Sequence, residues 1–483
     1  MIVGAGTSGS VLAARLCATP SLAVTLLESG EPDDYTAEIL EPVRASEVWS
    51  TFANSKVVAM ESSGGPIVML QGRILGGTSA INYLATVRGQ PADYDSWAAG
   101  GLAGWGWSDV RRYFIAAEND GDFGPSDIHG DSGPLRVSRW TTDEHRRFQR
   151  AFGEGLREIG VPPVADVNDP TQVPGIGVFP ATLDTARQRM TTSTAYLTDD
   201  VRKRSNLQIR TRATVTRVLI ENGRAVGVLL DSGEEVFADE IVLSAGAIAT
   251  PALLLRSGVG PRIQLAEHNL PVHADLPVGA TMSDHLGTVL SYQYDEPHTN
   301  CGGPAQSVLV GSSNGKDIDY HVFPTPSLTP GDSSAFLLLA YLLRSSGAGK
   351  VVLGDSPDHD PVVTAPPLPD DTDARLGHAF QLIAEWERST AARAIGIRAV
   401  EPHDLTSVTA VKEALARMTI SYGHMVGTCP MGPVLDAQGR VHGIAGLRVG
   451  DGSAMPSIPA GNTYLGCVMV AERIADFITA DED

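Results

Sequence analysis

The chain has 483 residues, of which 42% are hydrophobic and 19% are charged, a composition typical of a globular protein with two or three domains' worth of core. Its formal net charge is −21, and no basic run is longer than VRKR at 201–204. Because nucleic acids are bound by a clustered basic face, this class of partner is excluded and anionic membranes are disfavoured.

The cysteines and the apolar runs indicate the cellular compartment expected for the protein. Cys17, Cys301, Cys429 and Cys467 have no CxxC spacing, so we expect no disulfide framework or zinc ribbon, and reduced thiols in a cytoplasmic protein. The longest apolar run, AFLLLAYLL at 335–343, is far shorter than the roughly 20 residues of a membrane span and predicts a buried strand. Residue 1 already lies in a predicted strand, so no secretion signal is expected.

The first predicted elements form a dinucleotide-binding fingerprint. MIVGAGTSGSVLAARL reads as a strand, then Gly4-x-Gly6-x-x-Gly9, then a helix that begins near Thr7 and Ser8. Gly4 permits a tight turn, Gly6 lets the backbone approach a pyrophosphate, and Gly9 allows the helix to pack closely on the strand. The free N–H groups of the helix N-terminus can then bind the anion.

A second predicted strand, AVTLLES, ends at Glu28, about 20 residues after Gly9, where an acidic side chain can accept hydrogen bonds from an adenosine ribose. A solvated carboxylate at a strand end is the alternative. Since NAD and FAD share the ADP moiety, the fingerprint alone does not separate them.

Two later stretches separate these cofactors. Residues 72–82 read GRILGGTSAIN, followed by YLATVRGQPADYD, and residues 246–260 read GAIATPALLLRSGVG. Both resemble signature patterns of the glucose–methanol–choline (GMC) family of FAD-dependent oxidoreductases. The second matches at every patterned position, whereas the first departs once, at Thr86.

The resemblance extends over nearly the whole chain and is weakest between about 286 and 420. Further similar segments are TTSTAYL (191–197), RATVTRVLIENGRAVGV (212–228), LPVGATMSDH (276–285) and GLRVGDGSAMPSIPAGN (446–462). It implies an α/β fold in which a Rossmann-like FAD-binding domain (1–130, 187–285 and 420–483) is interwoven with a substrate domain (131–186 and 286–419). The substrate domain is expected to be an antiparallel sheet flanked by helices.

The resemblance also implies particular cofactor contacts. Residues expected to line the isoalloxazine ring are Gly77, Thr78, Asn82, Leu84 and Ala85. Val215 is expected at the adenine, and Asp451 and Gly452 at the ribityl and pyrophosphate. Some family members tether the flavin to a histidine, but residues 76–90 contain none and Ile81 occupies the corresponding position. We therefore expect non-covalent, dissociable FAD.

The substrate side carries less information. SAFLLLAYLL and GKVVLG, separated by SSGAG, predict an antiparallel hairpin. The stretch from Tyr294 to Tyr320 is short and rich in Gly, Ser and Asn, and predicts a short lid and an open cleft.

His424, in SYGHMVGTCPMG at 421–432, has three interpretations. A metal site needs three or four ligands, and Cys429 and Cys467 supply too few, so no metal is expected. A hydrogen-bonded core histidine is the default for an isolated His. The third interpretation is a base, because GHMVGTC resembles the family segment whose histidine faces the flavin.

The segment AGNTYLGCVMVAER resembles the one that supplies the partner of that histidine, here Asn462, just before the last predicted helix. The first turn of that helix, at Asn462 and Thr463, would direct N–H groups toward the flavin. Asn462 would hold the alcohol oxygen while His424 removes its proton. His442 and His285 are expected to be surface residues.

The resemblance thus implies an alcohol oxidase or dehydrogenase that acts on a neutral primary or secondary alcohol, with oxygen or another electron acceptor. Two rival functions remain: a hydroxynitrile-lyase-type enzyme with structural FAD, and a flavin-binding protein without catalysis. The particular alcohol, the acceptor and the oligomeric state are left open by the sequence.

Overall fold

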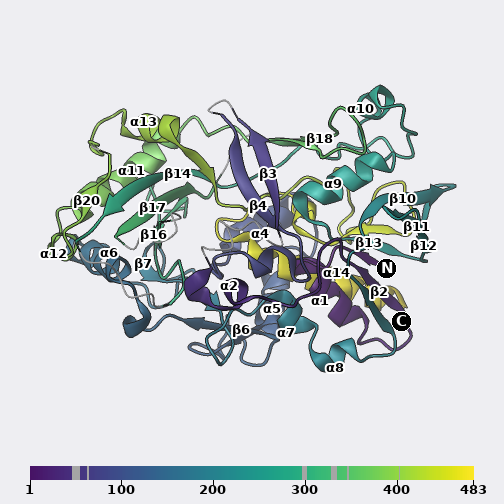
Figure 1. The fold of residues 1–483 in the computed structure, drawn as a ribbon, viewed down its shortest axis with the longest axis horizontal. Coiled ribbons are helices and arrows are strands. Elements are labelled where there is room, and N and C mark those ends of the chain that lie inside the picture. The colour runs from purple at the N-terminus through teal and green to yellow at the C-terminus, as the bar shows by residue number, and fades with distance from the viewer. Residues whose placement is uncertain are drawn as a thin grey trace.

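The computed structural model describes residues 1–45, 55–62, 65–295, 302–327, 334–344, 348–401 and 403–482. The elements gather in two halves along the long axis (Figure 1). One half, which contains both termini, is built on a parallel sheet, and the other on a large antiparallel sheet covered by helices.

The parallel sheet has five strands in the order β22-β13-β1-β2-β9. Their bounds are Ile2–Val3 (β1), Val24–Leu27 (β2), Leu207–Arg210 (β9), Ile241–Leu243 (β13) and Leu447–Val449 (β22). The helices α1 (Thr7–Leu16) and α14 (Thr463–Glu482) pack together beside it, where Arg15 pairs with Glu472 at 2.7 Å. β1, β13 and β22 are buried throughout and β2 nearly so, as expected for a parallel sheet with covered faces, whereas the edge strand β9 is half-buried to exposed.

Further elements surround this sheet. The meander of β10 (Val215–Glu221), β11 (Arg224–Leu230) and β12 (Glu235–Phe237) follows β9. The helices on this side are α2 (Ala37–Leu40), α4 (Pro91–Ala99), α5 (Trp107–Ala117), α7 (Thr192–Tyr196), α8 (Asp199–Arg202), α9 (Gly246–Arg256) and α10 (Arg262–Glu267), with 3-10 turns η1 (Pro42–Arg44), η2 (Gly77–Ala80) and η4 (Gly452–Ala454).

The antiparallel sheet follows the order β20-β14-β17-β16-β15-β7, and β21 also pairs with β14. Its strands are β7 (Gly175–Val178), β14 (Leu286–Gln293), β15 (Ser307–Gly311), β16 (Tyr320–Pro326), β17 (Ala335–Leu342), β20 (Arg398–Ala399) and β21 (Thr419–Ser421). The helices α6 (Arg147–Glu158), α11 (Thr372–Trp386), α12 (Thr390–Ala394) and α13 (Ala410–Arg417) cover it.

An aromatic core joins this sheet to its helices, because Phe148 of α6, Phe336 of β17 and Trp386 of α11 are all fully buried in one cluster. The predicted fold class, a Rossmann-like α/β unit combined with an antiparallel sheet flanked by helices, is confirmed. The residue boundaries of the two domains stay a prediction.

Two smaller sheets complete the fold. One has the order β18-β19-β3-β4, with β3 (Ser55–Glu61), β4 (Ile67–Gly72), β18 (Lys350–Val352) and β19 (Val362–Thr364). The other joins β5 (Glu118–Asp120), β6 (Leu135–Arg139) and β8 (Pro180–Thr182), and a 3-10 turn η3 (Thr142–Glu144) follows β6.

The predicted hairpin on the substrate side is wrong. The buried strand expected at 335–343 is present as β17, but β17 pairs with β14 and β16 along its two edges. Because both edges are occupied, the GKVVLG segment joins a different sheet, where β18 pairs with β19. Residues 345–347 of the connection lie outside the described residues.

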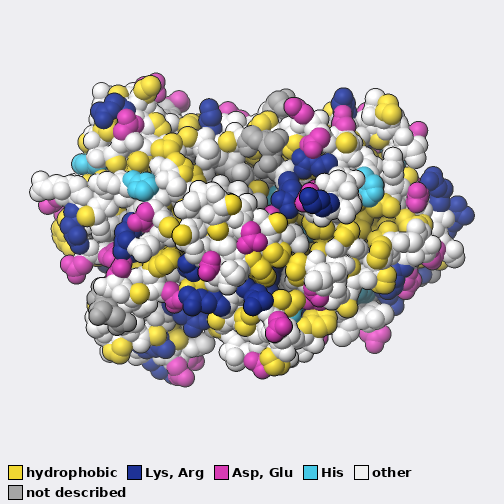
Figure 2. All heavy atoms as spheres, turned by 180° about the vertical axis from the view of Figure 1, so that it is seen from behind, with side chains coloured by type: hydrophobic (Ala, Val, Ile, Leu, Met, Phe, Trp, Pro, Cys, Tyr) yellow, Lys and Arg dark blue, Asp and Glu magenta, His cyan; other side chains and the backbone are white. Residues whose placement is uncertain are grey.

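Of the predicted lid at 294–320, residues 296–301, including Cys301, lie outside the described residues, and β15 occupies 307–311. No helix in the described part of the chain combines the length and apolarity that a membrane span requires. Acidic and basic side chains are interspersed on the face shown in Figure 2.

Candidate active site

The glycines of the fingerprint are packed against backbone. Gly4 has a φ of +95°, and a Cβ on it would lie 2.6 Å from the carbonyl oxygen of Ser244. A Cβ on Gly9 would lie 1.8 Å from the carbonyl oxygen of Gly4, so α1 approaches β1 as closely as backbones allow. The N-terminus of α1 has neither a side-chain cap nor an acidic residue in its first turn. Its N–H groups at Thr7 and Ser8 can therefore serve an anion.

The loop of the first signature lies directly beside this turn. Gly77, at a φ of +54°, would place a Cβ 2.6 Å from the Cα of Gly6, and the N–H of Gly76 donates to the carbonyl oxygen of Ala5 at 2.8 Å. Two glycine-rich segments more than 60 residues apart in the chain therefore form one cradle of backbone at the carboxyl end of β1.

Glu28 lies at the end of β2 and is 6% exposed. Its Oε2 accepts from the N–H of Ala5 at 2.9 Å, and its Oε1 accepts from the N–H of Gly30 at 2.8 Å. Burial raises the pKa of this carboxyl, although the two backbone N–H groups counteract it. Oε1 also accepts from the hydroxyl of Ser29 at 3.4 Å, so Oε2 keeps the free lone pair with which Glu28 can brace the glycine turn and still accept a hydrogen bond from a ribose.

Asp451 follows β22 and ties the cradle to α9. Its Oδ2 accepts from the N–H of Gly246 at 2.8 Å and from the hydroxyl of Thr250 at 2.7 Å, while its Oδ1 accepts from the N–H of Ser453 at 2.8 Å. The role expected for it was a direct contact with the cofactor. In the structure the carboxylate holds the turns around the cradle, and Gly452 lies beside it, with a Cβ position 3.0 Å from the Sγ of Cys467.

Residues predicted to line the isoalloxazine follow η2. The Oδ1 of Asn82 accepts from the N–H of Leu84 at 3.0 Å and from Nη1 of Arg189 at 2.8 Å. Leu84 is fully buried with a φ of +63°. Thr78 is exposed and Ala85 half-buried. Val215, predicted at the adenine, opens β10 and is half-buried beside the core of the parallel sheet.

Arg189 was missed by the sequence reasoning. It is 2% exposed, its Nη2 has no partner among the described residues, and burial lowers its pKa to about 10. The buried hydroxyls of Tyr464 and Ser244 also have no partner in this part of the structure. Because buried polar groups are normally hydrogen-bonded, these three atoms fit a polar ligand bound around the cradle.

His424 and Asn462 come together as predicted, from segments 38 residues apart. Nε2 of His424 and Nδ2 of Asn462 are 3.2 Å apart, and the two residues are 9% and 4% exposed. Asn462 immediately precedes α14 and its neighbour Thr463 is buried. Val87 fixes Asn462 from both sides: its N–H donates to Oδ1 at 3.0 Å, and its carbonyl oxygen accepts from the N–H of Asn462 at 2.7 Å.

His285 is not a surface residue, and this prediction was wrong. It is fully buried, and its Nδ1 lies 2.9 Å from Nδ1 of His424. The cause is an irregular antiparallel pairing, in which Ser283 bridges Val426 and Leu286 pairs with Ser421. The pairing places 284–285 opposite 422–425. His442, by contrast, is exposed, as expected.

Asp284 joins the two histidine segments. Its Oδ1 accepts from the N–H of His285 at 2.8 Å and from the N–H of His424 at 3.0 Å, and its Oδ2 accepts from the hydroxyl of Ser421. Burial raises the pKa of Asp284 to about 6. The carboxylate therefore acts on the backbone that carries both imidazoles.

Aromatic rings pack on His424. The ring of Tyr422 stacks on it with centroids 4.0 Å apart, and the ring of Tyr341 stacks on Tyr422 at 4.1 Å. Tyr422 stands two residues before His424, across Gly423, whose φ of +81° departs from an extended strand, so strand alternation could not have indicated the stack. The stack fixes the plane of the imidazole.

Burial sets the charge of the active-site histidines, His285, His321 and His424. It lowers the pKa of His424 well below the ordinary value, and the neighbouring His285 and His321 lower it further. Burial likewise lowers the pKa of His285 and of His321 to about 3. All three are therefore neutral at physiological pH, and in the described part of the chain His424 belongs to no group of three metal-ligating side chains.

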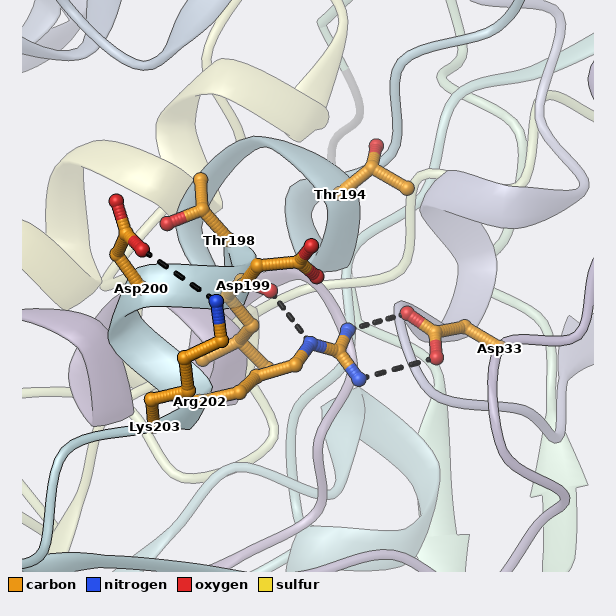
Figure 3. A pocket seen from close by; sticks show the side chains of 8 residues that line it. Asp33, Thr194, Thr198, Asp199, Asp200, Arg202 and Lys203 are labelled. Carbon is orange, nitrogen blue, oxygen red and sulfur yellow. Dashed lines mark hydrogen bonds and ion pairs between the residues drawn. The ribbon is translucent and has the colours of Figure 1, made fainter.

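A surface hollow beside α7 and α8 is a separate feature (Figure 3). In it Arg202 pairs with Asp33, and Nζ of Lys203 lies 3.7 Å from Oδ1 of Asp200. The predicted site residues are not among those that line it: Asp33, Thr194, Leu197, Thr198, Asp199, Asp200, Arg202 and Lys203. Its cations are already paired, so we assign no ligand to it.

Comparisons with known proteins identify the family. The protein-family description "GMC oxidoreductase" matches residues 1–287 with its N-terminal part and 345–471 with its C-terminal part. The chain belongs to the GMC oxidoreductase family. The enzyme class expected from the sequence, a GMC-type oxidase or dehydrogenase acting on CH–OH donors, is thereby confirmed, and as a member of this family the protein binds FAD.

Individual relatives cover nearly the whole chain. It is 32% identical to 5-(hydroxymethyl)furfural oxidase of Methylovorus sp. (strain MP688), over 99% of this chain and 98% of the relative. It is also 32% identical to oxygen-dependent choline dehydrogenase of Burkholderia multivorans, over 99% and 93%. Among solved structures, pyridoxine 4-oxidase from Mesorbium loti matches with a TM-score of 0.90 and 28% identity, over 99% and 98%.

Proposed function

We propose that this protein oxidises a neutral primary or secondary alcohol to an aldehyde or ketone, with FAD as cofactor and His424 as the base. The observation that carries the proposal is the 3.2 Å approach of His424 Nε2 to the Asn462 amide, at the junction of the cofactor cradle and the antiparallel sheet. When bound, FAD supplies the acceptor for the substrate hydride at N5 of its isoalloxazine.

The hydrogen bonds around Asn462 support one tautomer of His424. Since Oδ1 of Asn462 accepts from Val87, the NH2 group of Asn462 is the part that faces His424. Nε2 of His424 must then be an acceptor, so the ring proton lies on Nδ1 and is donated to Nδ1 of His285. Nε2 has a single lone pair, which accepts from Asn462 in this structure and becomes available for the hydroxyl proton when an alcohol takes the place of that hydrogen bond.

Asn462 and His424 therefore have complementary roles. The amide NH2 can donate to the alcohol oxygen, which holds the hydroxyl group beside Nε2 without competing for its proton. The lowered pKa of His424, caused first by burial, keeps the imidazole neutral and available as a base. His285 orients the base through the Nδ1 contact, and Asp284 positions both backbones.

The surroundings favour an uncharged substrate. The rings near His424 come from a buried cluster that includes Val87, Phe323 and Tyr341, with Tyr83 and Tyr422 packed against it. The one carboxylate identified next to the histidines, Asp284, is committed to two backbone N–H groups and a hydroxyl. The relatives named for 5-(hydroxymethyl)furfural and pyridoxine are consistent with a neutral alcohol of this class.

We also propose that FAD is held without a covalent bond. Ile81 is fully buried at the position where a tethering histidine would stand, and an isoleucine side chain offers no nucleophile. Acid precipitation of the holoprotein tests this proposal, because dissociable FAD stays in the supernatant whereas covalently bound flavin is found in the pellet. A cytoplasmic location is a further proposal, supported by the free thiols of Cys17, Cys429 and Cys467.

Anaerobic mixing of the purified holoprotein with a panel of alcohols tests the activity. We expect the flavin absorbance to bleach with at least one neutral alcohol, and the panel should include 5-(hydroxymethyl)furfural, pyridoxine and choline. Admission of air then distinguishes oxygen from another electron acceptor by the speed of re-oxidation. Cleavage of a cyanohydrin without bleaching would instead support a lyase. If neither bleaching nor cyanohydrin cleavage is observed, the result would support a flavin-binding protein without catalysis.

A further inference from the structure

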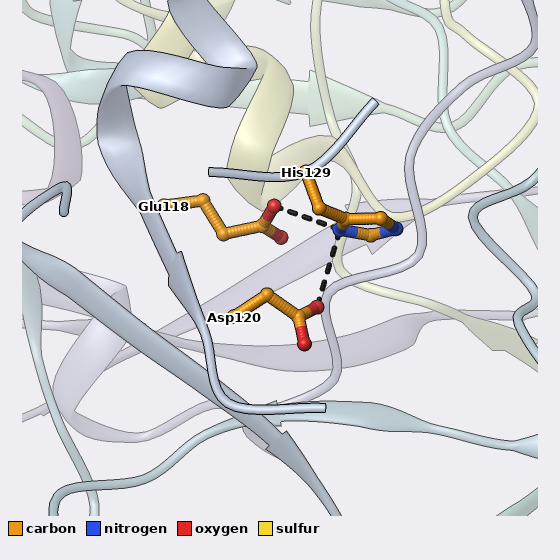
Figure 4. A group of neighbouring side chains, drawn as sticks. All are labelled: Glu118, Asp120 and His129. Carbon is orange, nitrogen blue, oxygen red and sulfur yellow. Dashed lines mark hydrogen bonds and ion pairs between the residues drawn. The ribbon is translucent and has the colours of Figure 1, made fainter. Parts of the chain in front are cut away.

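A second buried group of charged side chains lies outside the active site. It consists of Arg88, Glu118, Asp120, His129, Arg139 and Asp166, which we call the His129 cluster. Figure 4 shows the imidazole of His129 facing the carboxylates of Glu118 and Asp120 from the loop that follows β5. His129, Glu118, Asp120 and Asp166 are each between 1% and 3% exposed.

Both ring nitrogens of His129 contact carboxylates. Nδ1 lies 2.9 Å from Oε2 of Glu118 and 3.2 Å from Oδ2 of Asp120, and Nε2 lies 2.7 Å from Oδ2 of Asp166. An imidazole can donate from both nitrogens only as the imidazolium. Burial alone would lower the pKa of His129, but the hydrogen bonds to Asp120, Asp166 and Glu118 outweigh it and raise the pKa to about 10.

The charges of the cluster balance when His129 is protonated. Three carboxylates face two guanidinium groups and one imidazolium, and Arg139 pairs with both Asp120 and Asp166. At the exposed edge, Asp122 lies 3.7 Å from Arg139. The pKa of Asp169 is lowered, against the effect of burial, first by hydrogen bonds from Thr171 and Gln172 and to a smaller extent by the charge of His129. The two arginines neutralise two of the three carboxylates, and a proton on His129 neutralises the third. The cluster therefore needs a proton, and not a metal ion, to balance its charge.

A first arm leads from His129 through Glu118 to Arg88. Oε2 of Glu118 accepts from Nη2 of Arg88 at 2.6 Å, and Nη1 of Arg88 donates to the carbonyl oxygen of Ile128 at 2.5 Å. Arg88 is the residue after Val87, so this arm fixes one side of the Val87 backbone.

A second arm leads from His129 through Asp166 to Asn168. Oδ1 of Asp166 accepts from the N–H of Asn168 at 3.0 Å. The side-chain amide of Asn168 then contacts the backbone on both sides of Val87: its Oδ1 accepts from the N–H of Arg88 at 2.8 Å, and its Nδ2 donates to the carbonyl oxygen of Thr86 at 3.1 Å. The two arms thus converge on one residue.

Val87 is the residue that hydrogen-bonds both the backbone and the side chain of Asn462. We propose that the His129 imidazolium and its two arms position Asn462 for alcohol oxidation, with Arg88 and Asn168 as positioning residues. The inference rests on the proposed role of Asn462. The proposal gives the cluster a function beyond stability, because a displacement of the Val87 backbone would turn the Asn462 amide away from His424.

A double-mutant cycle tests the positioning role. The rate of anaerobic flavin reduction by saturating alcohol is measured for the holoprotein, Arg88→Gln, Asn462→Ala and the double variant, after equal FAD content is verified. We expect Arg88→Gln to slow reduction roughly tenfold alone and less than about twofold when Asn462 is already Ala, because coupled residues are not additive. Asn168→Ala is expected to show the same dependence on Asn462, and it replaces Arg88→Gln in the cycle if Arg88→Gln does not fold.

The control variant is Arg448→Gln, which removes an equally buried arginine, 3% exposed and paired with Glu240 and Asp481, away from Val87. We expect it to change the rate by less than about twofold, within the range of an uncoupled site. Equal slowing by Arg88→Gln in both backgrounds would overturn the positioning role. No slowing by Asn462→Ala itself would instead refute the proposed function of Asn462.

The charge of His129 has its own readout in the unmodified protein. Nuclear magnetic resonance of the holoprotein labelled with ¹⁵N-histidine should show one imidazolium that persists at about pH 9, where an ordinary histidine is neutral. If every histidine is neutral at that pH, the imidazolium at the centre of the two arms is refuted.

Discussion

Buried histidines in two regions of this protein differ in charge: those of the active site are neutral, and His129 is protonated. Among the active-site histidines, His285 contacts His424, while His321 packs against the rings of Tyr422 and Phe179. Burial lowers the pKa of all three. His129 is buried as deeply, yet three carboxylates raise its pKa to about 10. The comparison shows that burial favours the neutral imidazole and that only hydrogen-bonded counterions reverse this preference. A base requires the first environment, and a structural cation requires the second.

Removing the charge of His129 should have the largest effect on stability. His129→Gln leaves three buried carboxylates against two arginines, and breaking a buried charge pair typically costs about 3–5 kcal/mol. We expect a loss of this size in the free energy of unfolding from chemical denaturation of the holoprotein. His442→Gln, at an exposed histidine, should change it by less than about 0.5 kcal/mol. A loss below about 1 kcal/mol in His129→Gln would contradict the ionic account.

Giving the active-site histidines a counterion should make them resemble His129. In His321→Asp, a carboxylate replaces a neutral ring that now lowers the pKa of His424. We expect the acid limb of the pH profile of flavin reduction to move up by roughly 1–3 pH units, since a nearby opposite charge favours the imidazolium. His321→Asn removes the effect of the ring without adding a charge, so it should move the acid limb less than His321→Asp does. Identical profiles for the two variants would contradict the comparison.

The pH dependence of stability should also differ between the two groups. Because the native pKa of His129, about 10, lies above the ordinary 6.5, its stabilisation is complete below about pH 6.5 and is lost as the pH rises through 10. The difference in unfolding free energy between wild type and His129→Gln should therefore fall between these values, by at most about 1.4 kcal/mol per pH unit. A constant difference would show that the native imidazole is not protonated.

The sequence was most informative where the structure depends on local spacing. Gly4, Gly6 and Gly9 and the following helix form the expected turn, because a strand, a tight turn and a helix follow from consecutive residues. The pairing of His424 with Asn462 was expected only through the family resemblance, since a contact between residues 38 apart is not encoded in local periodicity.

Contacts made by non-local strand pairing were not predictable from the sequence. His285 was assigned to the surface because nothing in the local sequence at 283–285 reveals that this segment runs antiparallel to 421–426. The GKVVLG strand was predicted to pair with the strand at 335–343, but both edges of that strand, β17, are occupied by strands distant in or separated along the chain, β14 and β16. The partners of His129 lie up to 37 residues away, so its charge required three-dimensional coordinates.

The most direct test of the central claim is anaerobic stopped-flow measurement of flavin reduction in His424→Ala, with His442→Ala as the matched exposed control and a saturating alcohol. If Nε2 of His424 receives the hydroxyl proton, reduction in His424→Ala should slow by roughly 10²-fold or more, while His442→Ala keeps the wild-type rate. A His424→Ala enzyme that loads FAD and reduces it at the wild-type rate would contradict the account.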